Sequence, residues 1–201
     1  MKSRLKNLYK YLIENRKHEV NGWHKAYRDF YSQVAQIRER ITSGEGLSQN
    51  DEAFLKQLLY EKSNGIASRG QSVLSNDNFQ SFIKNKNFIS ALEKFILIPN
   101  SENFTIFSDS WSNQGKSNNP VLVNRVAAAC TLEVSTTVDS GKFNQVFSWL
   151  IREGIIPAYP AEENQSWFAK NIFLLKSIKS EFYNELREGK TDEFYLSQFV
   201  W

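Results

Sequence analysis

The chain has 201 residues, is 41% hydrophobic and 14% aromatic, and carries a formal net charge of +3. These values are typical of a folded globular protein rather than a disordered one. One cysteine excludes an internal disulfide, and two histidines far from it disfavour a zinc site. No apolar run is as long as a membrane helix requires, and the N-terminus lacks a secretory signal pattern. We therefore expect a cytoplasmic protein with no membrane partner.

Positive charge is concentrated in the first fifth of the chain. Residues 1–44 contain ten Lys and Arg against four Asp and Glu, whereas residues 45–112 and 113–201 have net charges of −2 and −1. Such an asymmetry is typical of a segment that contacts a phosphate backbone.

The first 46 residues predict a helical hairpin. Two runs of apolar residues at helical spacing flank an Asn21-Gly22 turn, and "SGEG" ends the hairpin at 43–46. The basic side chains that could bind phosphates are Lys2, Lys6, Lys10, Arg16, Lys17, Lys25, Arg28, Arg38 and Arg40. Trp23 or Tyr27 could stack on a base. The apolar stripe to which both belong also suits packing against the first helix. The alternative for the basic residues is an ordinary solvated helix face.

A polar, glycine-containing loop follows a helix that we expect to begin at Ser48. The loop spans residues 60–75 and has turn signals at Asn64-Gly65 and Arg69-Gly70. Its side chains of the type that hydrogen-bond to base edges are Asn64, Ser68, Arg69, Gln71 and Ser72. Glycines allow a backbone to approach DNA closely, but a tight structural connector explains them equally well.

Helical spacing returns over 76–98 until Pro99 stops it. Residues 100–119 have the Ser/Asn/Gly composition of a loop or linker, in which "NFTIF" could form one short strand. "GKS" at 115–117 lacks the glycine and the preceding strand of a phosphate-binding loop, so we expect no nucleotide site there.

The last third predicts further helices. Asn119 and Pro120 begin one, Asp139 or Ser140 begins the next, a long helix spans about 162–188, and residues 191–193 cap a final helix. We expect that final helix to continue to Trp201, as in a chain cut out of a longer protein.

These patterns predict an all-α protein with at most one or two short strands. Its expected parts are a helical N-terminal domain (1–112), a linker (113–119) and a helical adaptor (120–201).

No group of side chains predicts an enzyme or a cofactor site. We expect Cys130 to pack in the core, since both histidines are over a hundred residues away in sequence. The acidic pairs Asp51-Glu52 and Glu162-Glu163 suit the first turn of a helix, where they complement its dipole. We therefore expect neither catalytic nor metal-binding residues, and no cofactor.

One resemblance extends the hypothesis. "PVLVNRVAAACTLEVSTTVDSGKFNQVFSWLI" and "FYLSQFVW" resemble the segment that precedes the motor in McrB-like subunits of modification-dependent (McrBC-type) restriction systems, and "NGIASRGQSVLS" looks like sequence from their N-terminal regions. The resemblance covers roughly residues 120–201 and rests on helical-packing patterns rather than on catalytic signatures.

Membership of this family would imply a DNA-recognition segment in a system that defends against foreign DNA. An AAA+ GTPase module beyond this chain would assemble with other McrB-like subunits, and a McrC-like partner would supply the nuclease. The DNA partner would be duplex, methylated or not, bound at a modified base or a specific site. The helical sequence departs from the β-rich recognition domains of the family.

Two functions of different class therefore stand as hypotheses. The first is a non-enzymatic DNA-recognition segment, with its contacts on the basic hairpin and the 60–75 loop. The alternative is a protein-interaction or oligomerisation module without direct DNA contact.

Overall fold

The computed structural model describes residues 3–68, 70, 72, 74–113 and 119–200. Across these residues the fold is all-α, as predicted, and the one β feature is an isolated bridge between Ser63 and Ser68. The α-helices are α1 (Arg4–Asn15), α2 (Lys17–Thr42), α3 (Glu52–Leu55), α4 (Asn76–Lys84), α5 (Lys86–Leu97), α6 (Ser101–Ser112), α7 (Pro120–Cys130), α8 (Ser140–Arg152), α9 (Trp167–Glu181), α10 (Tyr183–Arg187) and α11 (Glu193–Phe199). A 3₁₀ turn (Gln49–Asp51) precedes α3, and a π-helix (η2, Lys56–Tyr60) follows it, in place of the single helix expected from Ser48.

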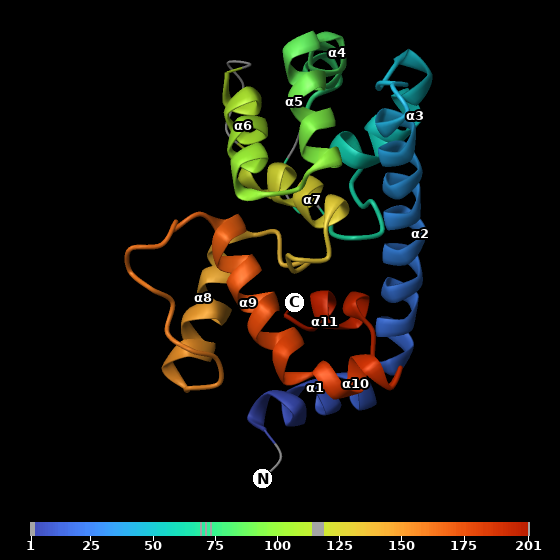
Figure 1. The fold of residues 1–201 in the computed structure, drawn as a ribbon. Coiled ribbons are helices and arrows are strands. Elements are labelled where there is room, and N and C mark those ends of the chain that lie inside the picture. Colours follow the sequence, from blue (N-terminus) through green and yellow to red (C-terminus); the bar gives the residue numbers. More distant parts are fainter. Residues whose placement is uncertain (1–2, 69, 71, 73, 114–118, 201) are drawn as a thin grey trace.

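Helix α2 runs the height of the molecule (Figure 1). Its buried face, including Tyr27, Phe30 and Val34, packs against α5, α7 and α11. The predicted hairpin turn at Asn21-Gly22 is wrong, because α2 continues through these residues and the chain instead breaks at Arg16. Burial of the long apolar face outweighs the roughly 1 kcal/mol that a glycine costs inside a helix.

The predicted loop at 100–119 contains a helix, α6, from Ser101 to Ser112. Phe104, Phe107 and Trp111 are buried on one face of α6, which packs against α5, and Asn100 caps its N-terminus through Asn103 N–H. The expected strand at "NFTIF" is therefore wrong, since the aromatic spacing of three and four residues buries one helical face. "GKS" lies outside the described residues.

The remaining helices follow three predicted caps and require three corrections, the first being that the long helix expected over about 162–188 is two helices, α9 and α10, separated at Phe182. Asn119, Asp139 and Asp192 accept backbone hydrogen bonds at the starts of α7, α8 and α11. The long helix begins at Trp167 with Ser166 as its cap, so Glu162 and Glu163 lie in the preceding loop rather than in a first turn. Helix α11 ends at Phe199 with Val200 as its C-cap, instead of continuing to Trp201, which lies outside the described residues.

The segment between α7 and α8 is buried although it is irregular and polar. Ser135 donates from N–H and Oγ to Asn171 Oδ1 (2.9 and 2.7 Å). Thr136 N–H donates to the Ser197 carbonyl (3.1 Å), and Thr137 Oγ1 donates to the Val200 carbonyl (3.0 Å). These bonds satisfy polar groups that would otherwise destabilise the core, and they tie the segment to α9 and to the end of α11.

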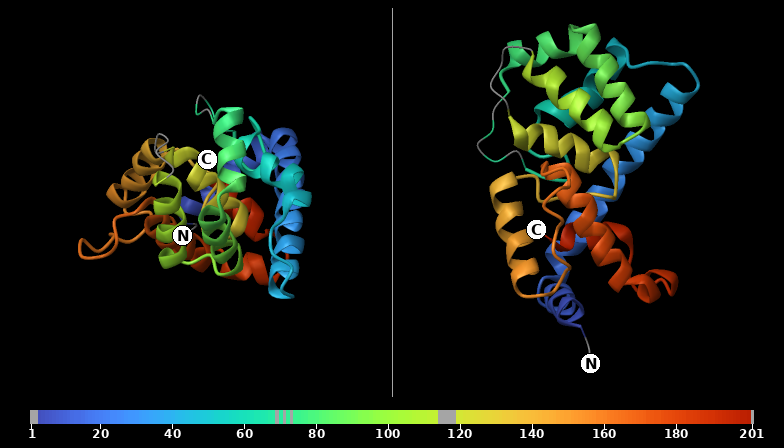
Figure 2. Two further views of the ribbon diagram at one scale, coloured as in Figure 1. Left: turned by 90° about the horizontal axis from the view of Figure 1, so that it is seen from above. Right: turned by 60° about the vertical axis from the view of Figure 1, so that its left-hand side comes forward.

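Helices α4, α5 and α6 gather at one end of the molecule, and α1 and α10 lie at the other (Figure 2). Helix α7 contacts α2 and α6 as well as α9, so packing joins residues on both sides of the predicted 113–119 linker. The division into domains stays a prediction, and residues 114–118 lie outside the described part of the chain.

Candidate nucleic-acid interface

Most of the predicted phosphate-binding side chains have acidic partners within the chain. Lys6 pairs with Glu185 (2.7 Å), Arg16 with Glu19 (2.6 Å) and Arg40 with Asp51 (2.6 Å). The other pairs are Lys10–Glu14, Lys25–Asp29 and Arg28–Asp192. The predicted basic surface is therefore largely neutralised where the structure describes it. Lys2 lies outside the described residues.

Arg38 and Lys17 differ from the paired residues. The Arg38 guanidinium donates to the backbone carbonyls of Ile96 (2.7 Å) and Cys130 (2.5 Å), so it joins the ends of α5 and α7. Lys17 is exposed and has no ion-pair partner among the residues that the structure describes. Of this set, Lys17 is thus the described cation most available to a phosphate.

The glycine-containing loop is folded against α2. Asn64 is fully buried, and its Oδ1 accepts hydrogen bonds from Ile66 N–H (3.2 Å) and Ala67 N–H (3.1 Å). Gly65 has a φ of +83°, and a Cβ there would lie 2.7 Å from the Ala26 carbonyl oxygen of α2. The Asn64-Gly65 turn therefore serves packing, the structural alternative that the sequence left open.

The exposed part of the loop retains polar groups. The Ser68 side chain is exposed and its Oγ accepts from Gly70 N–H (3.2 Å). Ser72 is partly buried. Arg69 and Gln71, two of the predicted DNA-contacting residues, lie outside the described residues.

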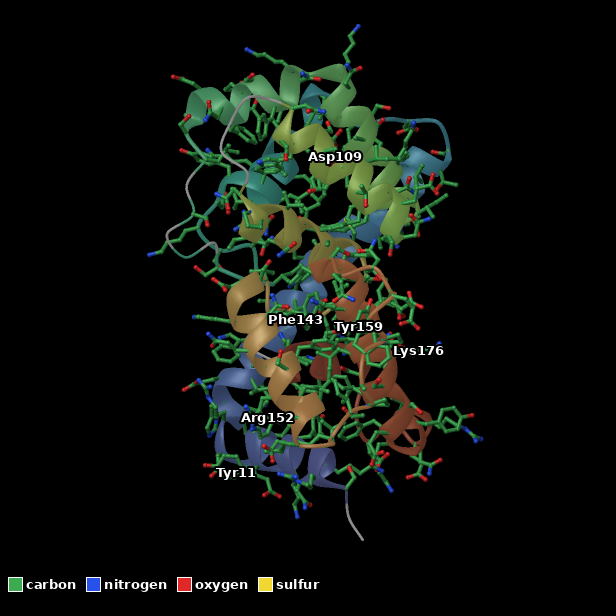
Figure 3. The ribbon with its side chains drawn as sticks, turned by 90° about the vertical axis from the view of Figure 1, so that its left-hand side faces the viewer. Tyr11, Asp109, Phe143, Arg152, Tyr159 and Lys176 are labelled. Atoms are coloured by element: carbon green, nitrogen blue, oxygen red, sulfur yellow. The ribbon has the colours of Figure 1, made fainter. Side chains whose placement is uncertain are left out.

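A cavity of about 850 Å³ lies between this loop, α2 and the segment before α8. It brings together Trp23, which the sequence analysis proposed as a stacking residue, and Ser68, which it proposed as a contact to base edges. Figure 3 shows the N-terminal end of α8, marked by Phe143, next to the loop. The lining residues are Trp23, Ala26, Ser63, Gly65, Ile66, Ala67, Ser68, Gly70, Ser72, Val121, Thr136, Thr137, Val138, Asp139, Lys142 and Gln198.

The lining is mostly neutral, with an aromatic side chain and two charged groups. Trp23 is 38% exposed, and the Arg16 guanidinium lies 5.3 Å from the centre of its ring. The charged side chains are Asp139, which accepts from the Lys142 N–H (2.8 Å), and Lys142, which has no ion-pair partner among the described residues. A ligand that carries a planar, uncharged ring next to a phosphate group would match this lining.

Gln198 lines the same cavity, but its amide oxygen is itself buried from solvent. The residue is 9% exposed, and its Oε1 has no hydrogen-bond partner in the described part of the chain. Thr136 and Thr137, which also line the cavity, donate hydrogen bonds to the carbonyls of Ser197 and Val200, one residue before and two residues after Gln198.

The sequence did not predict Lys142, Thr136, Thr137 or Gln198 as site residues. They belong to the part expected to be an adaptor, and none lies in a local motif that indicates binding. A lysine in the first turn of a helix and a glutamine near a chain end are common surface features, and only the packing of α8 and α11 brings them to this cavity.

The other candidate groups have structural roles. Cys130 is buried as predicted, and burial raises the pKa of its thiol to about 12, which opposes formation of a nucleophilic thiolate. Arg40 and the Ser48 donors lower the pKa of Asp51, which keeps this buried carboxylate ionised. Within the described residues, His, Cys, Asp and Glu form no cluster of three or more that could hold a metal ion.

Comparisons of the chain with protein-family models, curated proteins and solved structures gave no match. Among the described residues, none of the helices has the length and apolar character needed to cross a membrane.

Proposed function

We propose that this chain is the DNA-recognition part of a McrB-like restriction protein, and that the cavity beside Trp23 holds a base displaced from a duplex. The observation that carries the proposal is the mostly neutral cavity that Trp23 and Lys142 both line. The resemblance of residues 120–201 supplies the McrB-like context. It adds an AAA+ GTPase module outside this chain and a McrC-like nuclease partner; the composition adds a cytoplasmic location.

The energies are compatible with this role. Displacing a base from a duplex costs a few kcal/mol, and least when the base is unpaired or mismatched. Stacking on an aromatic side chain returns about 1–3 kcal/mol per base. Lys142 has no internal partner to give up among the described residues, so it can pair with a flanking phosphate without breaking an ion pair.

The paired cations of α1 and α2 support binding in a second way. Exposed ion pairs such as Lys10–Glu14 and Lys25–Asp29 contribute only about 0–1 kcal/mol each. These side chains can therefore exchange a carboxylate for a phosphate at small cost. Binding should weaken steeply as salt rises, because each phosphate contact releases counterions.

The test is fluorescence anisotropy with two labelled duplexes, one perfectly paired and one with a single unpaired base. Trp23→Ala removes the aromatic wall and Lys142→Glu reverses the charge. The controls are Tyr183→Ala, an exposed aromatic that also lies beneath an arginine, and Lys176→Glu, an exposed lysine without an ion-pair partner in the described chain. Neither control residue lines the cavity.

We expect the duplex with the unpaired base to bind more tightly. Trp23→Ala should weaken that binding about tenfold or more, and both controls should stay within about twofold of the wild type. Absence of binding at low salt, on methylated and unmethylated duplex alike, would refute the proposal. Equal losses in Trp23→Ala and Tyr183→Ala would refute the assigned site.

A second candidate function, a protein-interaction module, has one observation in its favour. Tyr11 is 70% exposed and Leu8 is 37% exposed, and the two lie one turn apart on α1. Sedimentation that shows concentration-dependent association of the chain, lost in Tyr11→Ala, would support this alternative.

A further inference from the structure

Asp139 lies at the cavity wall on a well-anchored stretch of backbone. The buried side chain of Asn124 donates from Nδ2 to the Val138 carbonyl (2.9 Å) and to Ser140 Oγ (3.0 Å). These two residues directly flank Asp139, whose own carbonyl accepts from Phe143 N–H (2.9 Å) as α8 begins. A side chain on such a fixed backbone is well suited to selective recognition.

The fold uses only one oxygen of the Asp139 carboxylate. Oδ1 accepts from Lys142 N–H (2.8 Å) and thereby caps α8. Among the described residues, Oδ2 accepts no hydrogen bond and the carboxylate forms no ion pair. Asp139 is exposed and lines the cavity, which leaves this second oxygen open to a ligand.

Asp139 and Lys142 bring opposite charges to one cavity without neutralising each other. The two residues lie about one turn apart and both line the cavity, at the end of α8 that Phe143 marks in Figure 3. Within the described part of the chain, no ion pair joins the carboxylate to the ammonium. A ligand that donates to the carboxylate and presents an anion to the ammonium would satisfy both. A nucleotide whose base carries an exocyclic amine has these two groups.

Other polar side chains at the cavity are less suited to read a base. Thr137 Oγ1 already donates to a backbone carbonyl (3.0 Å), and the Gln198 amide oxygen is buried from solvent. Ser68 Oγ accepts from a backbone N–H (3.2 Å) within its own loop. Asp139, the acidic residue of the lining, instead combines exposure with an acceptor that the fold leaves unused.

We propose that Asp139 is a specificity-determining residue and that its Oδ2 accepts a hydrogen bond from the exocyclic amine of the displaced base. This inference rests on the proposed function. Adenine and cytosine carry such an amine, whereas hypoxanthine and uracil carry a carbonyl oxygen at the same position. A carbonyl would place two acceptors face to face, so the cavity rejects these two bases.

The experiment compares otherwise identical duplexes whose single unpaired base is adenine, hypoxanthine, cytosine or uracil. Binding is measured by fluorescence anisotropy for the wild type, Asp139→Asn and Asp139→Ser. Asn and Ser are both good N-caps, so α8 keeps its start in both variants. The matched control is Asp77→Asn, which removes an exposed carboxylate from the first turn of α4, outside the cavity lining. Thermal unfolding of every variant is recorded alongside.

For the wild type we expect the amine-bearing base of at least one pair, adenine with hypoxanthine or cytosine with uracil, to bind about fivefold more tightly. Asp139→Ser should bring this ratio to about one, because the shorter side chain does not reach the amine. Asp139→Asn should reverse it, because the amide keeps the capping oxygen and places an N–H donor where Oδ2 was. Asp77→Asn should keep the wild-type ratio.

The ratio within a pair distinguishes recognition from two other effects of the substitution. Loss of a negative charge raises the affinity for all four duplexes alike, so it cancels in the ratio. A purely structural role of Asp139 would lower the melting temperature and weaken all four duplexes together, again without changing the ratio. A preference lost in Asp139→Ser and kept in Asp77→Asn therefore supports the assignment.

The remaining outcomes separate this inference from the proposed function. Trp23-dependent binding without a preference inside either pair overturns the assignment of Asp139 and leaves the DNA-recognition proposal standing. So does a preference that persists in both Asp139 variants, one that Asp77→Asn removes equally, or loss of the fold in both Asp139 variants. Absence of binding to every duplex overturns the DNA-recognition proposal itself, and the inference with it.

Discussion

Replacing Gly65 by alanine should destabilise the loop that forms one wall of the cavity. Gly65 has a φ of +83°, in the left-handed region that disfavours residues with a Cβ, and the new Cβ would lie 2.7 Å from the Ala26 carbonyl oxygen. Real Cβ atoms do not approach a backbone oxygen this closely, so either the loop or α2 must move. Both lie next to Trp23 and the cavity.

The expected cost combines two effects. The left-handed backbone costs about 1 kcal/mol for alanine, and the close contact adds about 2 kcal/mol by analogy with overpacking. For a domain of this size, 1 kcal/mol corresponds to a shift of about 2–4 °C in Tm. Gly65→Ala should therefore lower the Tm by about 6–12 °C.

The matched control is Gly154→Ala, measured by the same thermal melt followed by circular dichroism. Gly154 also has a positive φ (+62°), but a Cβ there would meet no atom within 4 Å in the described part of the chain. Its Tm should therefore fall by only about 2–4 °C. Equal shifts for the two variants would show that the contact with Ala26 does not constrain the loop, and would refute the reasoning.

Two further predictions concern ionisable groups. Because Arg40 lowers the pKa of Asp51, the pair stabilises the fold above the unfolded carboxyl pKa of about 3.9 and loses this contribution as pH falls through the lower folded value. Arg40→Gln should therefore lower the midpoint of urea unfolding at pH 7 and lower it clearly less at pH 2–3, and an equal shift at both would contradict the role of the charge. Cys130, with a buried thiol whose pKa is about 12, should react with Ellman's reagent at pH 8 only as the protein unfolds. Ser148→Cys, on the exposed side of α8, should add one fast-reacting thiol, and equal rates for the two thiols would show that Cys130 is accessible.

Local sequence signals predicted the starts of three helices. Asn119, Asp139 and Asp192 cap α7, α8 and α11 because a side-chain oxygen next to free N–H groups acts within three residues. The prediction was wrong for residues 101–112, where it followed the composition of the segment instead of the spacing of its aromatic residues. Residues 101–112 are rich in Ser and Asn, yet Phe104, Phe107 and Trp111 form a buried helical face. The turn expected at Asn21-Gly22 failed because α2 packs against α5, α7 and α11 as well as α1, and no local signal identifies these distant partners.

The candidate site was less predictable than the fold. Trp23 and Ser68 were proposed from the sequence and do line the cavity, whereas Lys17 and the paired cations lie outside its lining. Two of the acidic partners of these cations, Glu185 for Lys6 and Asp192 for Arg28, are over 160 residues distant in sequence, so charge counting along one segment could not detect them.

The sequence by itself determined the all-α class, the caps of α7, α8 and α11 and the burial of Cys130, because hydrophobic periodicity and capping act over a few residues. Tertiary structure alone decided that Trp23, Lys142 and Gln198 share one cavity, since they lie on α2, α8 and α11. Their proximity depends on how these helices pack through the buried segment before α8, and such long-range packing leaves no periodic trace in the chain.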